Sequence, residues 1–299
     1  MPREQRDGLL FILLAAVGYA CFPIFTKFIY ADPALTPLDV VTWRFIFAAP
    51  LVWLTLRLLR APQPPSPLPR LKLVGLGVLF AMLATCAFFS LSLLPASLYT
   101  VLLYTYPAMV AIISLLIGDR LPLRGWIALA LTLVGVVLTV PNLGEGGTVT
   151  VEGLLITLIG NCLLYAIYLV LSGRVMRANT AAGYAIAWGI TGSLLTVLLL
   201  IPLRGLTVPT IPSAWFGLIA LALFSTIMPG FAMLAGIGRL GASRAAILST
   251  TEPVMTIVLA LLLLPGETMT ALQIFGAALV LISVVLLQLP SRSSASATS

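Results

Sequence analysis

The chain has 299 residues, of which 61% are hydrophobic and 8% are charged, and its mean hydropathy is +1.15. A soluble domain has too much surface to cover for this composition, since about 25% of its residues are normally charged. Most of the chain is therefore expected to lie in a lipid bilayer. The net charge of +7 does not indicate nucleic-acid binding, because the basic residues are scattered between apolar runs. With no histidine, and three cysteines without a metal-ligand spacing, we expect no metal and no cofactor.

Ten apolar runs approach the length of about 20 residues that a helix needs to cross the hydrocarbon core. They cover residues 8–29, 37–59, 71–93, 96–117, 123–141, 152–173, 180–202, 213–237, 242–263 and 270–289. The chain is thus predicted to be an all-α integral membrane protein with ten transmembrane helices. The first run is too long for a signal peptide, and the Ser-rich tail at 291–299 is predicted to be disordered.

The basic residues predict the orientation, because Lys and Arg concentrate on the cytoplasmic side of a membrane. If the ten spans alternate, 13 of the 16 Lys and Arg residues fall on one side. The other side has Arg204, and the spans themselves contain Lys27 and Arg44. Both termini are therefore predicted to be cytoplasmic.

The two halves of the chain look alike. Asp7-Gly8-Leu9-Leu10 recurs 145 residues later as Glu152-Gly153-Leu154-Leu155, and Pro107 and Pro253 are 146 residues apart. We divide the chain into repeats at 1–143 and 144–290. Five helices is an odd number, so the second copy must enter the membrane from the opposite side. Inverted repeats place a binding site near the midplane, and rocking of the two halves alternates access to it.

Short motifs recur in each half of the chain. They are Gly18-Tyr19, Phe22 and Lys27 in the first span, then Trp43-Arg44-Phe45, Glu252-Pro253 and Gly266-Glu267. Together they resemble the EamA-type unit of the drug/metabolite transporter superfamily, although the family's usual Trp is absent from the first motif. The resemblance covers residues 8–289 and implies a ten-helix secondary transporter of the bacterial inner membrane. Within the family the chain looks most similar to exporters of aromatic and other neutral amino acids. Its expected partners are the small-molecule substrate and the bilayer, with no nucleic acid, and we expect a monomer.

Two ionisable residues are predicted to lie deep in the membrane. Glu252 is about 15 Å into its span, where a charge costs at least ~2.5–3.5 kcal/mol. It couples transport to protons, binds a substrate ammonium, or pairs with Arg44 or a neighbouring helix. Arg44 binds a substrate carboxylate through its planar fork, or is locked to Glu252 or Asp39. Lys27 is expected to snorkel to the outer edge, with Asp32 or Asp39 as its partner.

Further candidates share helix faces and would offer stacking surfaces and hydrogen bonds to an aromatic amino acid. They are Asn161, Tyr165 and Tyr168 on one span, Tyr99 and Tyr106 on another, and Thr85 with Phe89 and Ser92 on a third. The alternative is that these groups only hold helices together. The candidate hinges inside spans are Pro23, Pro107, Pro229, Gly230 and Pro253.

Other classes of membrane protein fit less well. The chain has no G-x-x-x-x-G-K-[ST] motif for an ATP-driven pump, no cluster of catalytic groups for an enzyme, and no rings of charge for a channel. A non-transporting sensor or scaffold stays open as an alternative. So does a carrier of a sugar phosphate or nucleotide sugar, which would require more cavity-facing cations than Arg44 and Lys27.

The orientation can be tested by placing single cysteines at Gly146 and Ser294. An impermeant thiol reagent applied to whole cells is expected to modify the first position and not the second, because the loop at Gly146 is predicted outside and the tail inside. The opposite labelling pattern would contradict the orientation of the inverted repeat.

Overall fold

The computed structural model describes residues 3–61, 68–94, 99, 102–119, 121–139, 150–177, 181–199, 201–252, 254–255 and 270–288, and the statements below concern these residues. The helices of the first repeat are α1 (Arg3–Ala20), α2 (Phe22–Ile29), α3 (Pro37–Leu58), α4 (Arg70–Leu93), α6 (Tyr106–Leu116) and α7 (Leu123–Thr139). Those of the second are α8 (Val151–Leu155), η1 (Ile156–Leu163), α9 (Leu164–Arg177), α10 (Ala182–Leu198), α11 (Ile201–Arg204), α12 (Pro212–Ala222), η2 (Leu223–Ile227), α13 (Met228–Leu240), α14 (Ala242–Ser249) and α16 (Ala271–Gln288).

Helix boundaries follow local chemistry. Thr36 and Asp39 form a reciprocal capping box at the start of α3, with Pro37 in the first turn. Pro212 occupies the first turn of α12 in the same way. Gly241 ends α13 with a φ of 82°, a backbone conformation that residues other than glycine rarely adopt.

Five helical segments are long and apolar enough to cross a membrane. They are Pro37–Leu58, Arg70–Ser90, Val151–Met176, Ala182–Leu203 and Pro212–Leu240. Shorter apolar helices are Tyr106–Leu116, Leu123–Leu138 and Ile274–Ser283. Large apolar side chains such as Val134 and Leu281 are about half exposed on the outside, whereas Thr132 and Ser283 are fully buried between α7 and α16 and share a 2.7 Å hydrogen bond. Apolar groups outside and satisfied polar groups inside are what a bilayer requires.

Three predicted spans are broken rather than continuous. The first is divided at Cys21 into α1 and α2. The fourth is interrupted at Tyr104 and Thr105, and α6 begins immediately after this turn. The ninth is interrupted at Thr250 and Thr251, after α14. The last two turns are 146 residues apart, the same separation as the repeat, so the two copies share this break.

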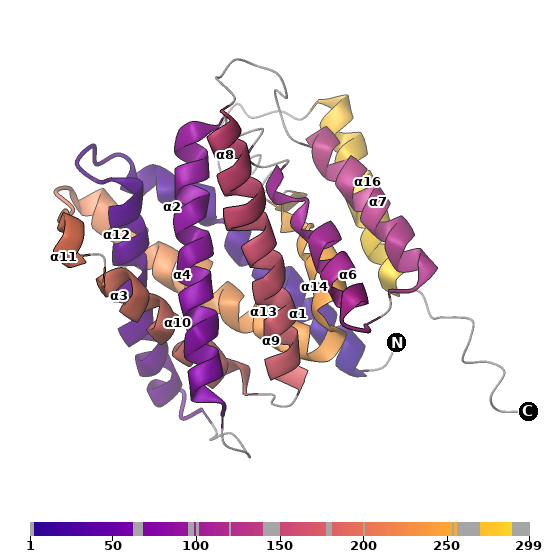
Figure 1. The fold of residues 1–299 in the computed structure, drawn as a ribbon, viewed down its shortest axis with the longest axis horizontal. Helices are drawn as coiled ribbons and strands as arrows, with labels where there is room; N and C mark the ends of the chain where they lie inside the picture. The colour runs from indigo at the N-terminus through magenta and orange to yellow at the C-terminus, as the bar shows by residue number, and fades with distance from the viewer. Residues whose placement is uncertain are drawn as a thin grey trace, which may run out of the picture.

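The two repeats interleave in space. α1 packs on α13, and α2 and α3 pack on α12, whereas α4 packs on α10 and η1, and α6 packs on α9. Helices of one repeat therefore pack mainly on helices of the other. α7 and α16 pair at one edge of the molecule, and α4 and α9 run across its front (Figure 1).

α4 and α10 approach each other closely through glycine. A Cβ atom on Gly77 would overlap the carbonyl oxygen of Gly189, and one on Gly192 would overlap the carbonyl oxygen of Val74. Ser193 donates a 2.8 Å hydrogen bond to the carbonyl of Gly77 across the same seam. Small residues and a hydroxyl thus allow the two backbones to touch, as is common between membrane helices.

Gly77→Ala is expected to lower the free energy of unfolding by about 1–3 kcal/mol, because the new methyl group meets backbone atoms that cannot move aside. Thermal unfolding of the purified protein in detergent measures the effect. Gly75→Ala is the matched control on the same helix, because nothing lies within 4 Å of its Cβ position. Equal stability of the two variants would contradict the close approach.

Candidate functional site

Arg44 lies in the middle of α3 and is only 6% exposed. Its Nε donates to Oγ1 of Thr226 at 2.7 Å, and its Nη2 donates to the carbonyl oxygen of Ser225 at 3.2 Å. Both acceptors belong to the π-helical turn η2 of the other repeat. In the described part of the chain Arg44 has no ion pair with Glu252 or Asp39, so the predicted lock to either carboxylate is not seen.

Aromatic rings continue from Arg44 across the interior. The guanidinium carbon lies 5.8 Å from the ring centre of Phe80. The next ring centres are Tyr168, 5.4 Å from Phe80, then Tyr165 at 6.2 Å, and then Tyr106 at 4.7 Å from Tyr165. We call Phe80, Tyr168, Tyr165 and Tyr106 the aromatic wall. Its four rings come from α4, α9 and α6, so both repeats contribute to it.

Glu252 lies directly after the break in the ninth span and is partly exposed. Its carboxyl group is electrostatically coupled to the hydroxyls of Tyr19, Tyr106 and Tyr165. The same kind of coupling extends to Tyr99 and Tyr104. A carboxyl group coupled to several phenols forms a polar centre in an otherwise apolar bundle.

The central residues form two pairs that the repeat relates. Tyr19 and Tyr165 are 146 residues apart, and so are Tyr106 and Glu252. Tyr106 and Glu252 each follow one of the two equivalent helix breaks. The inverted repeat therefore brings four related positions to one place, and only Glu252 among them carries a carboxylate.

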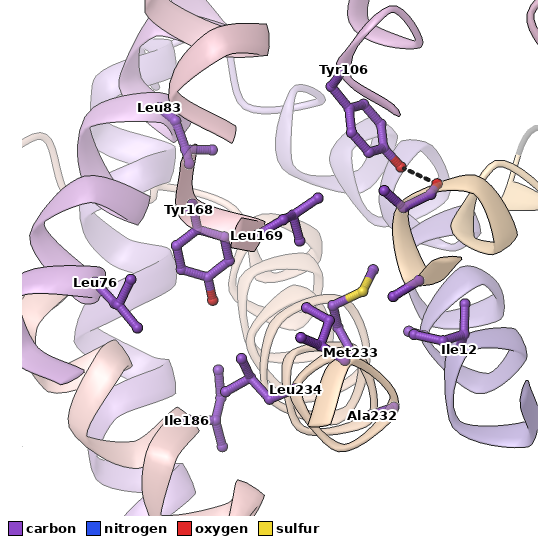
Figure 2. Packing of buried hydrophobic residues seen from close by; sticks show 14 of the residues in the cluster. Ile12, Leu76, Leu83, Tyr106, Tyr168, Leu169, Ile186, Ala232, Met233 and Leu234 are labelled. Atoms are coloured by element: carbon purple, nitrogen blue, oxygen red, sulfur yellow. Dashed lines mark hydrogen bonds between the residues drawn. The ribbon is translucent and has the colours of Figure 1, made fainter. Parts of the chain in front are cut away.

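Tyr106 and Tyr168 make different use of their hydroxyls. The Tyr106 hydroxyl shares a 2.6 Å hydrogen bond with Ser249 at the end of α14, and Figure 2 shows it directed at that helix. The Tyr168 hydroxyl points instead toward Ile186 and Leu234 (Figure 2), at a small apolar pocket that both line. Tyr106 thus connects the fourth and ninth spans, while Tyr168 offers its ring to the wall.

Asn161 and Tyr99 bond to each other. The Asn161 amide donates to the carbonyl oxygen of Leu83 at 2.9 Å, and its Oδ1 accepts from the Tyr99 hydroxyl at 3.4 Å. Asn161 is 2% exposed. These bonds join η1 to α4, so the geometry favours the helix-packing role for Asn161.

Thr85 falls on a stripe of α4 that also carries the exposed Val78, Met82 and Phe89. Its hydroxyl donates to the carbonyl of Ala81 in its own helix at 2.8 Å. Thr85 is not one of the residues of the aromatic wall, and its hydroxyl bonds within its own helix.

Two of the predicted hinges, Pro23 and Pro107, stand at helix breaks, and Pro229 follows the π-helical turn η2 directly. Pro23, Pro107 and Pro229 each occupy the first turn of a helix, namely α2, α6 and α13. Gly230 is buried in α13, and a Cβ atom there would meet Cδ1 of Ile186 at 2.6 Å. Pro253, like the side chain of Lys27, lies outside the described part of the structure. The positions of the breaks are thus established, and hinge motion stays a prediction.

Asp32 and Asp39 hold the loop 205–211 that precedes α12. Asp32 accepts the backbone N–H of Thr210 at 2.6 Å, and Asp39 accepts that of Thr207 at 3.2 Å. Trp43 Nε1 donates to the carbonyl oxygen of Thr207 at 2.7 Å. The two carboxylates, predicted as partners of Lys27, therefore bond to this loop and connect the repeats at one end of the bundle.

Three central residues were absent from the predicted site: Tyr19, Phe80 and Thr226. Tyr19 could have been found, because the separation of 146 residues pairs it with Tyr165. The π-helical geometry that presents Thr226 leaves no signal in the sequence, and Phe80 is one of many apolar residues on its helix.

A chain of interleaved apolar helices around a deep polar centre is a multi-pass membrane protein of the transporter type. The chain matches the EamA-like transporter family over residues 6–140 and 153–289 and belongs to that family. It is 28% identical to uncharacterized transporter sll1319 of Synechocystis, with 94% of this chain and 92% of the relative aligned. It is 29% identical to uncharacterized transporter YcbK of Bacillus subtilis, with 92% and 90% aligned. A crystal structure of 19% identity has the same fold, with a TM-score of 0.79 over 97% of this chain and 99% of its own.

These similarities confirm the predicted family and the architecture of two inverted five-helix repeats. They also confirm transport as the activity, since both relatives are named transporters. The first matched segment contains the break before Tyr106, and the second contains the break before Glu252.

The Asp32 contact predicts a pH dependence of stability. Hydrogen bonds from the N–H groups of Thr210, Ala34 and Ile211 outweigh burial and hold the pKa of the Asp32 carboxyl below its ordinary value of 3.8. A lowered pKa means that the carboxylate stabilises the folded state above pH 3.8, and that this contribution is lost as the pH falls through the folded-state pKa. Asp32→Asn is therefore expected to lower the unfolding temperature at neutral pH and to match the parent in strong acid.

Thermal unfolding in detergent from neutral pH into strong acid measures this difference. Asp7→Asn is the control, because Asp7 forms an exposed ion pair with Arg6 at 3.6 Å, and exposed pairs contribute little to stability. A difference between Asp32→Asn and the parent that does not change with pH would contradict the assignment.

Proposed function

We propose that this transporter exports amino acids, including aromatic and other neutral ones. Alternating access takes place at a central site formed by Arg44, the aromatic wall and Glu252. The observation that carries the proposal is the electrostatic coupling of Glu252 with Tyr19, Tyr106 and Tyr165, of which Tyr106 and Tyr165 are in ring contact. A carboxylate is a counter-charge for a substrate ammonium, and phenol rings offer both hydrogen bonds and flat apolar surface. An aromatic side chain would stack on the aromatic wall.

The charges of the site support a substrate of low net charge. Arg44 has no ion pair in the described part of the chain. An amino acid offers it a single carboxylate, whereas a nucleotide sugar or sugar phosphate carries further negative charge that would need several cations. Among the side chains described in the central cluster, Arg44 is the one cation, so the amino acid fits better.

Direction and orientation rest on different arguments. Export follows from the family resemblance, and the cytoplasmic position of both termini follows from the distribution of basic residues. The repeat places each broken helix in the opposite sense to its partner, which is the arrangement through which a carrier opens first to one side and then to the other.

Counterflow in proteoliposomes tests the proposal. Labelled phenylalanine is expected to exchange, and unlabelled threonine and methionine are expected to compete, while glucose and a nucleotide sugar do not. Tyr165→Ala is expected to lower the apparent affinity for phenylalanine about two- to tenfold, since an aromatic contact contributes about 0.5–1.5 kcal/mol. Threonine transport should be largely kept.

The exposed Tyr30 at the end of α2 supplies the control, because Tyr30→Ala removes a ring far from the aromatic wall. Competition by the sugars without competition by amino acids would overturn the proposed substrate class. An equal loss of phenylalanine and threonine transport in Tyr165→Ala would assign Tyr165 to folding instead.

A further inference from the structure

The guanidinium of Arg44 is a buried charge without a carboxylate partner in the described part of the chain. Arg44 is only 6% exposed. The rings of Phe22, Phe45 and Phe80 surround its guanidinium, with ring centres 5.8 Å from the guanidinium carbon. Aromatic faces stabilise a cation but do not neutralise it. A charge in this setting is costly unless an opposite charge reaches it.

The bonds of Arg44 leave a defined part of the guanidinium available. A guanidinium has five N–H donors in a planar fork. Thr226 takes the Nε donor and the Ser225 carbonyl takes one Nη2 donor, so both bonds lie along the Nε edge of the guanidinium. One hydrogen of Nη2 and one of Nη1 remain side by side at the end of the fork, and the second hydrogen of Nη1 points back toward Cδ. A carboxylate accepts two parallel hydrogen bonds in that end-on geometry.

The π-helical turn η2 fixes this orientation. The Thr226 hydroxyl donates to the carbonyl oxygen of Leu221 at 2.9 Å, five residues back, and can then only accept from Arg44. The Ser225 hydroxyl donates to the carbonyl oxygen of Gly18 in α1 at 2.8 Å. Both hydroxyls are therefore committed as donors, and η2 is attached to α1 as well as to α3. The Thr226 oxygen is therefore held beside Nε of Arg44 and fixes the orientation of the guanidinium.

We propose that Arg44 binds the carboxylate of the transported substrate end-on, and that Thr226 is the positioning residue that presents the guanidinium. This inference rests on the proposed function, since it assigns the acid group of the amino acid to Arg44. It predicts that the protein distinguishes ligands by the presence of a carboxylate, independently of the aromatic wall.

Two simple probes separate the acid group from the amine. 3-Phenylpropionate has the ring and the carboxylate of phenylalanine, and phenethylamine has the ring and the ammonium. We expect 3-phenylpropionate to raise the unfolding temperature of the parent protein in detergent in a saturable way. Thr226→Val has nearly the same shape but no hydroxyl. It should raise the apparent dissociation constant for 3-phenylpropionate about tenfold, which corresponds to about 1.4 kcal/mol of binding free energy. Its response to phenethylamine should not change.

Conservative variants distinguish positioning from folding. Thr226→Ser keeps the hydroxyl and should restore the affinity for 3-phenylpropionate. Thr55→Val on α3 removes a hydroxyl that bonds only to its own helix, at the carbonyl of Leu51, and should behave as the parent. Arg44→Lys keeps the charge but not the fork, and should lose affinity for the acid probe if it folds.

The possible results separate this inference from the proposed function. Binding of 3-phenylpropionate that Thr226→Val weakens selectively supports the carboxylate site, even if phenylalanine counterflow fails and the amino acid proposal falls. Phenylalanine counterflow with no response to 3-phenylpropionate overturns the carboxylate site and keeps the transport proposal. Equal loss of both probes in Thr226→Val, or no loss of either, also overturns it.

Discussion

The hydrocarbon of a bilayer cannot hydrogen-bond a backbone, and this constraint decides where the chain can interrupt its helices. The fourth and ninth spans break at equivalent positions, and both breaks face the interior of the bundle. Tyr106 and Glu252 follow these breaks, so the places where backbone geometry is irregular are also the places where polar side chains gather. Tyr19 and Tyr165, a second pair related by the repeat, complete the centre.

The buried charge of Arg44 organises the other end of the aromatic wall. Its two hydrogen bonds reach across to η2 of the second repeat, and Ser225 connects the same turn to α1. A π-helical turn has one residue more than an α-helical turn, which displaces the backbone locally. Here it brings a hydroxyl and a carbonyl to the same guanidinium. The first repeat supplies the charge, and the second supplies its orientation.

Interleaving of the repeats changes how movement must be pictured. α1 packs mainly on α13, α2 on α12 and α4 on α10, whereas α3 packs on both α10 and α12, and α6 packs on both α9 and α14. Helices that pack together therefore come from both repeats, so a unit that moves must contain helices of both, and α7 and α16 pair at the edge (Figure 1). The bonds of Asp32 and Asp39 to the loop before α12 also connect the two repeats.

Hydropathy, the separation of 146 residues and a few short motifs determined the membrane class, the repeat and the family, because each is a property of the linear chain. They also located the breaks near Pro107 and Pro253. The partners of Arg44, Asn161 and Asp32 depended on which helix faces meet, and those partners are far away in the sequence. Apolar spans look alike on every face, so only tertiary packing decided that Arg44 meets Thr226 and that Tyr106 meets Ser249.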